Sequence, residues 1–368
     1  MKDRVRRVME SLSPKADALV LANSVEPHLD MSFFYLFDAP SGLFEGSHAV
    51  AFPDGRLHVF SSPLEEESAR QAAKGDSSVE VHTETGDEKQ KVLKGLLGSS
   101  KNVALNFHEL THESYLAIAK AFPKASFSDA SEALRRVRRI KDKKEVERLE
   151  RAAGFASKVA TEIPSMLHRG MTELELAAEI EHRMMLGGAA GRSFATIVGF
   201  GPKSAEPHYA PADRPLTPGV SIVCDFGALC ERYASDITRS FRFGPRDDEL
   251  KRVHETVARA QAAALEVIRP GAIAKDVHGA AQAVVDASPW KGRFTHGLGH
   301  SIGLAVHDGF AMNHLIDVPL EEGMAITVEP GIYLPGRGGV RIEDDIVVTR
   351  NGYRFLTTAP REYIEVPA

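Results

Sequence analysis

The sequence predicts a chain in two parts, an α/β unit followed by an α+β unit. Its 368 residues exceed the length of a typical single domain. Helical and strand patterns alternate over residues 1–138, whereas pairs of helices alternate with antiparallel hairpins over residues 139–368. We therefore expect a three-layer α/β domain at 1–138 and an α+β domain at 139–368, divided within the basic run at 134–144.

Short periodic segments define the first part. Helices are expected over residues 4–12, 63–73, 88–97 and 113–121, and strands over 16–22, 79–83 and 102–106. A hairpin over residues 48–61 would turn at Asp54-Gly55. Four histidines of this part, His28, His82, His108 and His112, show no ligand spacing, and we expect them at the surface.

Capping residues and breakers define the helices of the second part. Asp142 is a suitable N-cap for a helix that runs to about residue 167, and Thr172 to Glu175 has the spacing of a capping box. Two further helices are expected over residues 247–268 and 274–287, separated by a Pro-Gly breaker. A strand over residues 194–201 leads into a loop rich in Gly and Pro that contains His208.

Composition excludes several classes of protein. A net charge of -6 gives no reason to expect nucleic acid or an anionic membrane as partner. Two cysteines provide neither a disulfide framework nor a thiolate metal site. The first residues do not read as a signal peptide, and no run approaches the roughly 20 apolar residues of a membrane span. These observations predict a cytoplasmic protein.

The chemistry centres on a predicted hairpin over residues 220–241. Asp225 and Asp236 each occupy a strand position where an apolar residue is expected. Burying a lone carboxylate is very unfavourable unless a positive charge neutralises it, and two neighbouring carboxylates repel each other. A metal ion between them is the simplest explanation. The alternative is an ordinary hairpin with acids at its exposed edge.

The same pattern returns over residues 327–348. Glu329 ends one strand-like run, a Gly/Pro-rich turn follows, and Glu343 lies in the second run. A single hairpin of this kind would be interpreted as ordinary surface structure. Two in one domain indicate similar halves that face each other across a site.

The segment between the hairpins supplies nitrogen ligands. His296, His300 and His307 lie within twelve residues and among glycines. The spacing of His296 and His300 resembles that of zinc-binding helices, but the glycines oppose a helix and no glutamate follows His296. A set of mostly oxygen ligands with one imidazole is rich enough to hold two divalent ions, and it suits Mn²⁺ or Co²⁺ better than a structural zinc. Its members are Asp225, Asp236, His300, Glu329 and Glu343.

Five motifs in order, HYAP, VCDFGA with SDITRSF, HGLGHSIGLAVHD, TVEPGIY and RIEDDIVV, resemble those of the pita-bread metallopeptidases. Within these, the chain is similar to the proline-specific branch, family M24B, which comprises prolidase and aminopeptidase P. The resemblance implies a pita-bread catalytic domain at 139–368 and a creatinase-like three-layer N-terminal domain at 1–138.

The resemblance also implies a role for each ligand. Asp225 would bind one metal ion, His300 and Glu329 would bind the second, and Asp236 and Glu343 would bridge both. A water or hydroxide held between the two ions would be the nucleophile. Glu329 would take its proton and pass it to the leaving nitrogen. Two Mn²⁺ ions per subunit are expected, with Co²⁺ or Zn²⁺ as alternatives.

Further residues are implied around the ligands. His307 would stabilise the oxyanion, and His208 would contact substrate or shuttle protons. His296 matches a position near the proline-binding pocket, and Arg341 would orient Glu343 or a substrate group. Thr238 fits a supporting hydroxyl. The structural alternatives are that His208 and His296 are loop histidines, and that Arg341 neutralises an acid.

Function is expected to be hydrolysis of Xaa-Pro bonds in proline-containing peptides by an Xaa-Pro dipeptidase (prolidase), with aminopeptidase P as the alternative. Relatives that bind a free carboxylate present an arginine soon after the His307 motif. The run from Asp308 to Gly323 has no Arg or Lys and offers only His314, and Phe194 replaces a common tyrosine. An inactive pita-bread binding protein is a further alternative, although no ligand is missing. A homodimer is expected from the resemblance.

Overall fold

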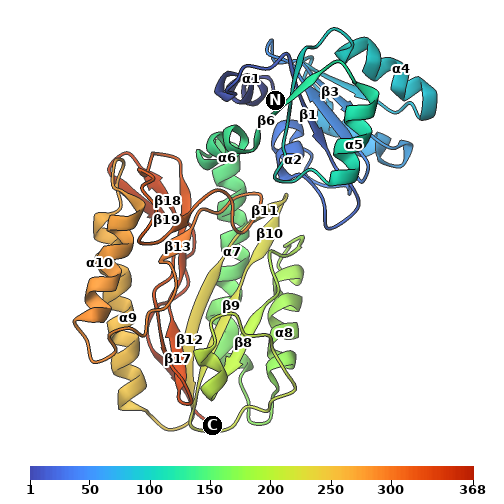
Figure 1. Ribbon diagram of the computed structural model, residues 1–368. Helices are drawn as coiled ribbons and strands as arrows, with labels where there is room; N and C mark the ends of the chain where they lie inside the picture. The colour runs from blue at the N-terminus through green and yellow to red at the C-terminus, as the bar shows by residue number, and fades with distance from the viewer. The chain divides into compact units, whose positions relative to one another are not determined.

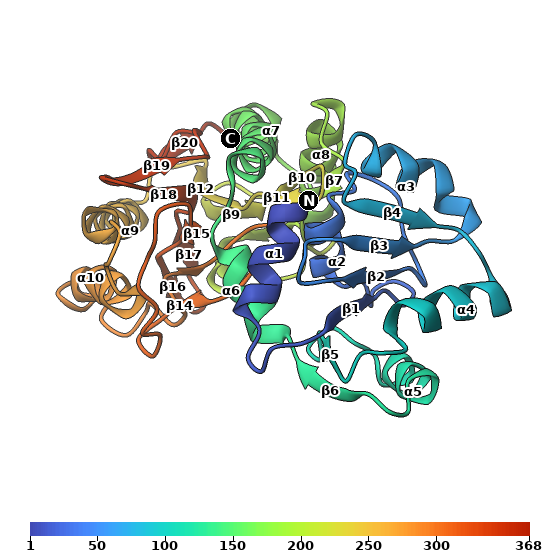
Figure 2. The same cartoon turned by 90° about the horizontal axis from the view of Figure 1, so that it is seen from above.

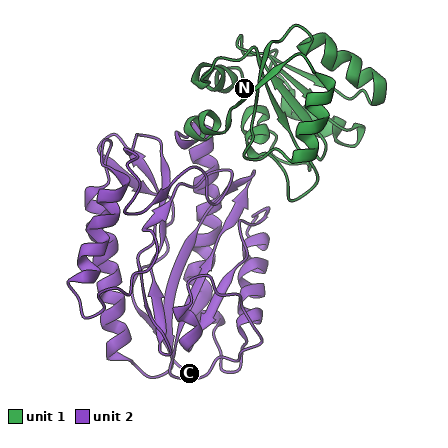
Figure 3. Ribbon diagram, in the orientation of Figure 1, with its two compact units in different colours: residues 1–138 green, residues 139–368 purple.

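The computed structural model describes all residues, 1–368, and divides them into two compact units, Met1–Arg138 and Arg139–Ala368 (Figure 3). Each unit has a hydrophobic core of its own. None of the helices combines the length and the apolar character that a membrane crossing requires.

Unit 1 is built on a six-stranded mixed sheet with the strand order β4-β3-β2-β1-β5-β6 (Figure 2). β1 pairs antiparallel with β2 and parallel with β5, and β2 and β3 form the hairpin expected around Asp54-Gly55. The strands are β1 (Ala18–Ala22), β2 (His48–Ala51), β3 (Leu57–Phe60), β4 (Val79–His82), β5 (Asn102–Leu105) and β6 (Ser126–Asp129).

Helices cover both faces of this sheet. All five residues of β1 are buried, as expected for a strand covered on both sides. Leu93, Leu97 and Ile118, from α4 and α5, join Val20 and Val50 in one cluster, while α2 packs against β1, β2 and β3. The three-layer expectation is confirmed. The helices are α1 (Lys2–Ser11), α2 (Met31–Phe37), α3 (Glu66–Ala73), α4 (Gly86–Leu97), α5 (His112–Ala121) and α6 (Ser131–Arg139), with a 3-10 turn, η1 (Pro63–Glu65).

The expectation of a surface position was wrong for His82. The parallel register of β3 and β4 sets Phe60 beside His82 and His58 beside Glu80, so both histidines lie on one face. Both are buried, with 3.0 Å between His58 Nδ1 and His82 Nε2 and only 18° between the ring planes. The two ring nitrogens are within hydrogen-bond distance, so one imidazole can donate to the other.

Unit 2 consists of two sheet systems lined by helix pairs (Figure 1). The first sheet has the order β20-β12-β9-β8 and packs against α7 and α8, and the second has the order β15-β18-β19 and packs against α9 and α10. The helices are α7 (Lys143–Met166), α8 (Glu173–Leu186), α9 (Asp248–Val267) and α10 (Ala274–Asp286), with a 3-10 segment, η2 (Gly201–Ala205). The main strands are β8 (Ile197–Phe200), β9 (Val220–Phe226), β12 (Ile237–Phe243), β15 (Ala325–Val328), β18 (Asp344–Thr349), β19 (Gly352–Phe355) and β20 (Ile364–Val366).

Capping residues begin the first two helices of unit 2 as predicted. The Asp142 side chain accepts a hydrogen bond from the Glu145 backbone, and the Glu145 carboxylate accepts one from the Asp142 backbone. Thr172 and Glu175 form the same reciprocal box at α8. Each box satisfies backbone N–H groups that the helix itself leaves unpaired.

The predicted acidic hairpins are more elaborate than a pair of strands and a turn. Between β9 and β12 the chain forms a small inner hairpin, β10 (Ala228–Cys230) and β11 (Tyr233–Ala234). Its turn residues, Glu231 and Arg232, have φ values of 47° and 72°, which are uncommon for residues other than glycine. Arg148 and Arg151 hold the Glu231 carboxylate.

Between β15 and β18 lies a second inner hairpin, β16 (Gly331–Leu334) and β17 (Gly338–Arg341). The remaining short strands are β7 (Gly191–Arg192), β13 (Gly299–His300) and β14 (Ala311–Met312).

Candidate metal centre

The β9–β12 pair brings two acids to one face. Asp225 of β9 lies opposite Thr238 of β12, and Asp236 precedes Thr238 by two residues. Side chains alternate along a strand, so Asp236 and Thr238 project to the side that Asp225 occupies. Both carboxylates are buried.

The β15–β18 pair brings two more acids to the point where its ladder ends. Val328, the last residue of β15, lies opposite Asp344, the first residue of β18. Glu329 and Glu343 are therefore the next residues beyond the paired ends of the two strands. The Asp236 backbone N–H donates to Asp345 Oδ2 at 2.8 Å, and the Glu343 N–H donates to the Thr238 carbonyl at 3.2 Å. These contacts join the two pairs and draw the four acids into one cluster.

His300 completes the cluster from β13. Its backbone N–H donates to Thr327 Oγ1, and its Nδ1 lies 3.3 Å from the Ser301 carbonyl, so Nε2 faces the acids. Nε2 is 3.6 Å from Asp236 Oδ2 and 3.6 Å from Glu329 Oε1. Asp236, His300 and Glu343 each offer one ligand atom, and these atoms lie within 4.8 Å of one another.

Arg341 is directed at Asp225. Its Nη2 donates to Asp225 Oδ2 at 2.5 Å, its Nε to Thr238 Oγ1 at 2.9 Å, and its Nη1 to the Tyr333 hydroxyl at 2.9 Å. The Thr238 hydroxyl donates in turn to Glu343 Oε2 at 2.6 Å. Arg341 was expected to orient Glu343 or a substrate group. Its hydrogen bonds connect it to Glu343 only through the Thr238 hydroxyl. The Arg341 side chain is buried.

His296 lies at the other end of this row of hydrogen bonds. Its Nε2 is 2.8 Å from the Tyr333 hydroxyl, and its Nδ1 is 2.7 Å from the Gly297 carbonyl. A carbonyl only accepts, so Nδ1 carries the proton and Nε2 accepts from Tyr333. Both ring nitrogens are therefore satisfied within the chain, which leaves the ring face for contact with a ligand.

The electrostatics of the cluster favour a bound cation. Burial, followed by repulsion from Glu343 and Asp225, raises the pKa of Asp236 well above its usual value. Burial and neighbouring acids likewise raise the pKa of Glu343, and burial raises the pKa of Glu329 to about 8. Burial also lowers the pKa of His300 to about 4, so its imidazole stays neutral and able to bind a metal ion.

The residues present fit a divalent metal centre. Asp225 Oδ1 and Asp236 Oδ1 are buried and have no hydrogen-bond partner, although buried polar atoms are normally paired. Arg341 supplies one positive charge to a cluster of four carboxylates. Cations that accept several oxygen ligands and one imidazole would satisfy both the orphaned atoms and the excess negative charge.

Two further predicted histidines lie beside the cluster. The rings of His300 and His307 meet edge to face, with 4.2 Å between their centroids. Partial burial and then the neighbouring His208 lower the pKa of His307, and His208 is also among the groups that lower the pKa of His296. His208 and His307 are exposed. The structure thus brings all nine predicted site residues into one region of unit 2.

Two residues of this region were not singled out from the sequence. Tyr333 lies inside the TVEPGIY motif, and strand alternation from Glu329 would have placed it near the acids. Glu173 follows the N-cap of α8, where an acid is usually explained by the helix dipole alone. The sequence carries no signal that the Glu173 side chain is fully buried.

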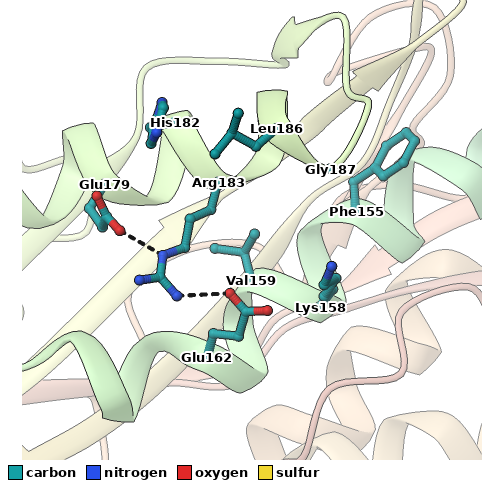
Figure 4. Close-up of a pocket in the computed structure, with 9 residues that line it drawn as sticks. All are labelled: Phe155, Lys158, Val159, Glu162, Glu179, His182, Arg183, Leu186 and Gly187. Atoms are coloured by element: carbon teal, nitrogen blue, oxygen red, sulfur yellow. Dashed lines mark hydrogen bonds and ion pairs between the residues drawn. The ribbon is translucent and has the colours of Figure 1, made fainter.

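A groove of about 410 Å³ between α7 and α8 is separate from the centre (Figure 4). Arg183 spans it by pairing with both Glu162 and Glu179. None of the nine predicted site residues lines it. Both of these glutamates are paired with Arg183, so we interpret the groove as helix-to-helix packing.

Comparison with known proteins identifies the family. The sequence matches metallopeptidase family M24 over residues 147–350 and the creatinase/prolidase N-terminal domain over residues 2–140. The Xaa-Pro dipeptidase of Pyrococcus horikoshii is 32% identical over 368 residues, which cover 99% of each chain.

Solved structures give the same result. The X-Pro aminopeptidase from Thermotoga maritima MSB8 superposes with a TM-score of 0.90 at 33% identity, covering 99% of this chain and 100% of that chain. The Xaa-Pro dipeptidase from Bacillus anthracis superposes with a TM-score of 0.90 at 31% identity, covering 99% of each. The expected resemblance is confirmed, and the chain belongs to metallopeptidase family M24, with a creatinase-like N-terminal unit and a pita-bread peptidase unit.

Proposed function

We propose that this protein is an Xaa-Pro dipeptidase, a hydrolase of the bond between any residue and a following proline. The observation that carries the proposal is the convergence of Asp225, Asp236, His300, Glu329 and Glu343 in one cluster whose orphaned oxygens and excess negative charge call for cations. Likeness to named Xaa-Pro dipeptidases over nearly the whole chain supports the substrate class. Such a bond lacks the N–H that most proteases grip, so it needs a dedicated site.

The five side chains would hold two divalent ions, for which we propose Mn²⁺, with Co²⁺ or Zn²⁺ as alternatives. Bound ions of this kind lower the pKa of a coordinated water and polarise the substrate carbonyl. Glu329 is suited to move a proton, because its side chain is 17% exposed compared with 7% for Asp236. Arg341 and Thr238 keep Asp225 and Glu343 in place through their hydrogen bonds.

His307 and His208 are proposed to act on the substrate. Both are exposed beside the cluster, so either can donate a hydrogen bond to a carbonyl oxygen as it gains charge. We expect His307→Ala to lower kcat by about 10²-fold. Steady-state kinetics on Ala-Pro test this, with His168→Ala, at an exposed helix end, as the control. A kcat equal to that of the control would assign His307 to structure.

Aminopeptidase P is the second candidate. One observation favours it, the absence of Arg and Lys from residues 308–323. The TM-score of 0.90 to an X-Pro aminopeptidase equals that to an Xaa-Pro dipeptidase and does not separate the two. Hydrolysis of Ala-Pro and of Arg-Pro-Pro separates the two functions. Turnover of the dipeptide alone supports a dipeptidase, turnover of the tripeptide alone supports an aminopeptidase, and turnover of neither rejects both.

We also propose a cellular compartment and an oligomeric state. Both cysteines are buried free thiols, and burial raises the pKa of Cys224, which suits a reducing cytoplasm. A homodimer is proposed from the family resemblance. Sedimentation velocity would test it, since a single species with the 40.1 kDa mass of one chain would reject a dimer.

A further inference from the structure

The loop that carries His208 is fastened at both ends to one carboxylate. Glu173, the first residue of α8, has a side chain with 0% exposure. Its Oε1 accepts from the Phe200 backbone N–H at 2.8 Å, where β8 ends and the loop begins. Its Oε2 accepts from the Tyr209 hydroxyl at 2.8 Å and from the Ala212 N–H at 3.1 Å, on the far side of His208.

Two more contacts strengthen this attachment. The Glu173 backbone N–H donates to the Arg214 carbonyl at 3.2 Å, and the Arg214 guanidinium lies 3.7 Å from Oε1. A fully buried carboxylate is very unfavourable unless its oxygens are satisfied, so the loop and the acid stabilise each other. The capping of α8 does not require the contacts of Glu173 with Phe200, Tyr209 and Ala212, so these contacts need another explanation.

His208 itself is exposed, and the hydrogen bonds that hold its neighbours do not include its ring. Its place beside His307 and His296 therefore depends on the path of residues 200–212. A ring held only through its backbone moves when that backbone moves, and a displacement of about 1 Å in a reacting group can lower the rate about 10²-fold.

We propose that Glu173 is a positioning residue that sets the location of His208 in the active site. The inference rests on the proposed function for its kinetic consequence, while the geometric statement stands on the contacts of Glu173. Because Glu173 contacts neither the acids of the metal centre nor His300, its substitution is expected to leave metal binding intact.

Glu173→Gln is the sharpest variant. The amide keeps the volume and one acceptor for Phe200, but it turns an NH₂ group towards the Ala212 N–H, which already donates. Glu179→Gln is the matched control, because Glu179 lies on the same helix and pairs with Arg183, away from the loop. Tyr209→Phe removes one of the donors to Glu173 and should give a smaller effect of the same kind.

Kinetics on Ala-Pro give the first readout. We expect Glu173→Gln to lower kcat/KM about tenfold, with the same division between kcat and KM as His208→Ala. In a His208→Ala background the added loss should be no more than about twofold, because coupled residues are not additive. Metal content should equal that of the control. Additive losses, or a reduced metal content, would overturn the proposal.

Chemical modification gives a readout that needs no activity. The rate at which diethyl pyrocarbonate modifies His208, followed by mass spectrometry, should change in Glu173→Gln and stay at the wild-type value in Glu179→Gln. An unchanged rate in Glu173→Gln overturns the positioning role. If wild-type protein cleaves no Xaa-Pro peptide while the modification rates still differ, the proposed function fails and the positioning of His208 stands.

Discussion

Single residues around the metal centre owe their orientation to specific partners. Asp225 is held by Arg341, Glu343 by Thr238, and His300 by Thr327. Asp236 differs, because Asp345 holds only its backbone N–H, its Oδ1 has no partner, and its Oδ2 lies 3.6 Å from His300 Nε2. Among the proposed ligands, Asp236 is thus the one whose carboxylate depends most on a cation.

We expect Asp236→Asn to remove at least one divalent ion per chain and to lower kcat on Ala-Pro by at least about 10²-fold. The amide halves the ligand capacity of a group that two ions would share, and it removes one negative charge. Metal analysis after dialysis against Mn²⁺ checks this. Asp317→Asn, at an exposed position, is the control. Two ions and full activity in Asp236→Asn would contradict the ligand assignment.

His254 gives a pH prediction away from the centre. Burial and then Arg239 lower its pKa to about 4, and its ring packs on Tyr363 of the same unit. The unfolded chain binds a proton below about pH 6.5, whereas the folded chain does so only near pH 4. The free energy of unfolding should therefore fall as the pH falls from 6.5 towards 4, by roughly 3 kcal/mol from this residue.

Urea unfolding in EDTA at pH 7 and pH 4.5 measures this contribution. In His254→Phe, which keeps a ring against Tyr363 but cannot titrate, stability should fall less over that interval than in wild type. Parallel losses in the two proteins would show that His254 is as easily protonated in the folded chain as in the unfolded one.

Helices and strands show which elements a sequence can predict. The capping boxes at Asp142 and Thr172 need only residues three apart, so both helix starts could be predicted. The acids in the hairpins could be paired because strand alternation is local. The inner hairpin at Glu231 and Arg232 could not be predicted, because its positive φ values are maintained by contacts with Arg148 and Arg151 about 80 residues away.

Thr172→Ala tests the cap of α8. It should lower the free energy of unfolding by about 1 kcal/mol, because the Glu175 backbone N–H loses its acceptor. Urea denaturation measures the change, with Thr358→Ala as the control, because the Thr358 backbone rather than its hydroxyl is hydrogen bonded. Equal stability of the two variants would mean that solvent replaces the cap without loss.

The molecule as a whole consists of two units with separate cores, and every predicted ligand belongs to unit 2. The sequence predicts such a division through its change of pattern, from interleaved helices and strands over the first 138 residues to helix pairs and acid-bearing hairpins over the rest. It could not predict the burial of His82, because a cross-strand partner such as His58 is set by sheet register.

Metal binding should therefore stabilise only one unit. A ligand that binds the folded state at about 100 times its Kd adds about 2.7 kcal/mol to stability. Scanning calorimetry of the full chain should show that Mn²⁺ raises the transition of unit 2 and leaves that of unit 1 in place. The Asp236→Asn chain identifies the shifted transition, since its shift should be reduced. A single transition that moves as one would show that the units unfold together.

The hydrogen bonds from Arg341 through Tyr333 to His296 can be donated in only one direction along the row. A guanidinium can only donate and the Gly297 carbonyl can only accept, so the direction of each hydrogen between them is settled. No member can surrender or gain a proton without breaking the sequence of donors. The Arg341–Tyr333–His296 row is for this reason unsuited to proton transfer, and we expect the carboxylates and the two exposed imidazoles to move protons during turnover.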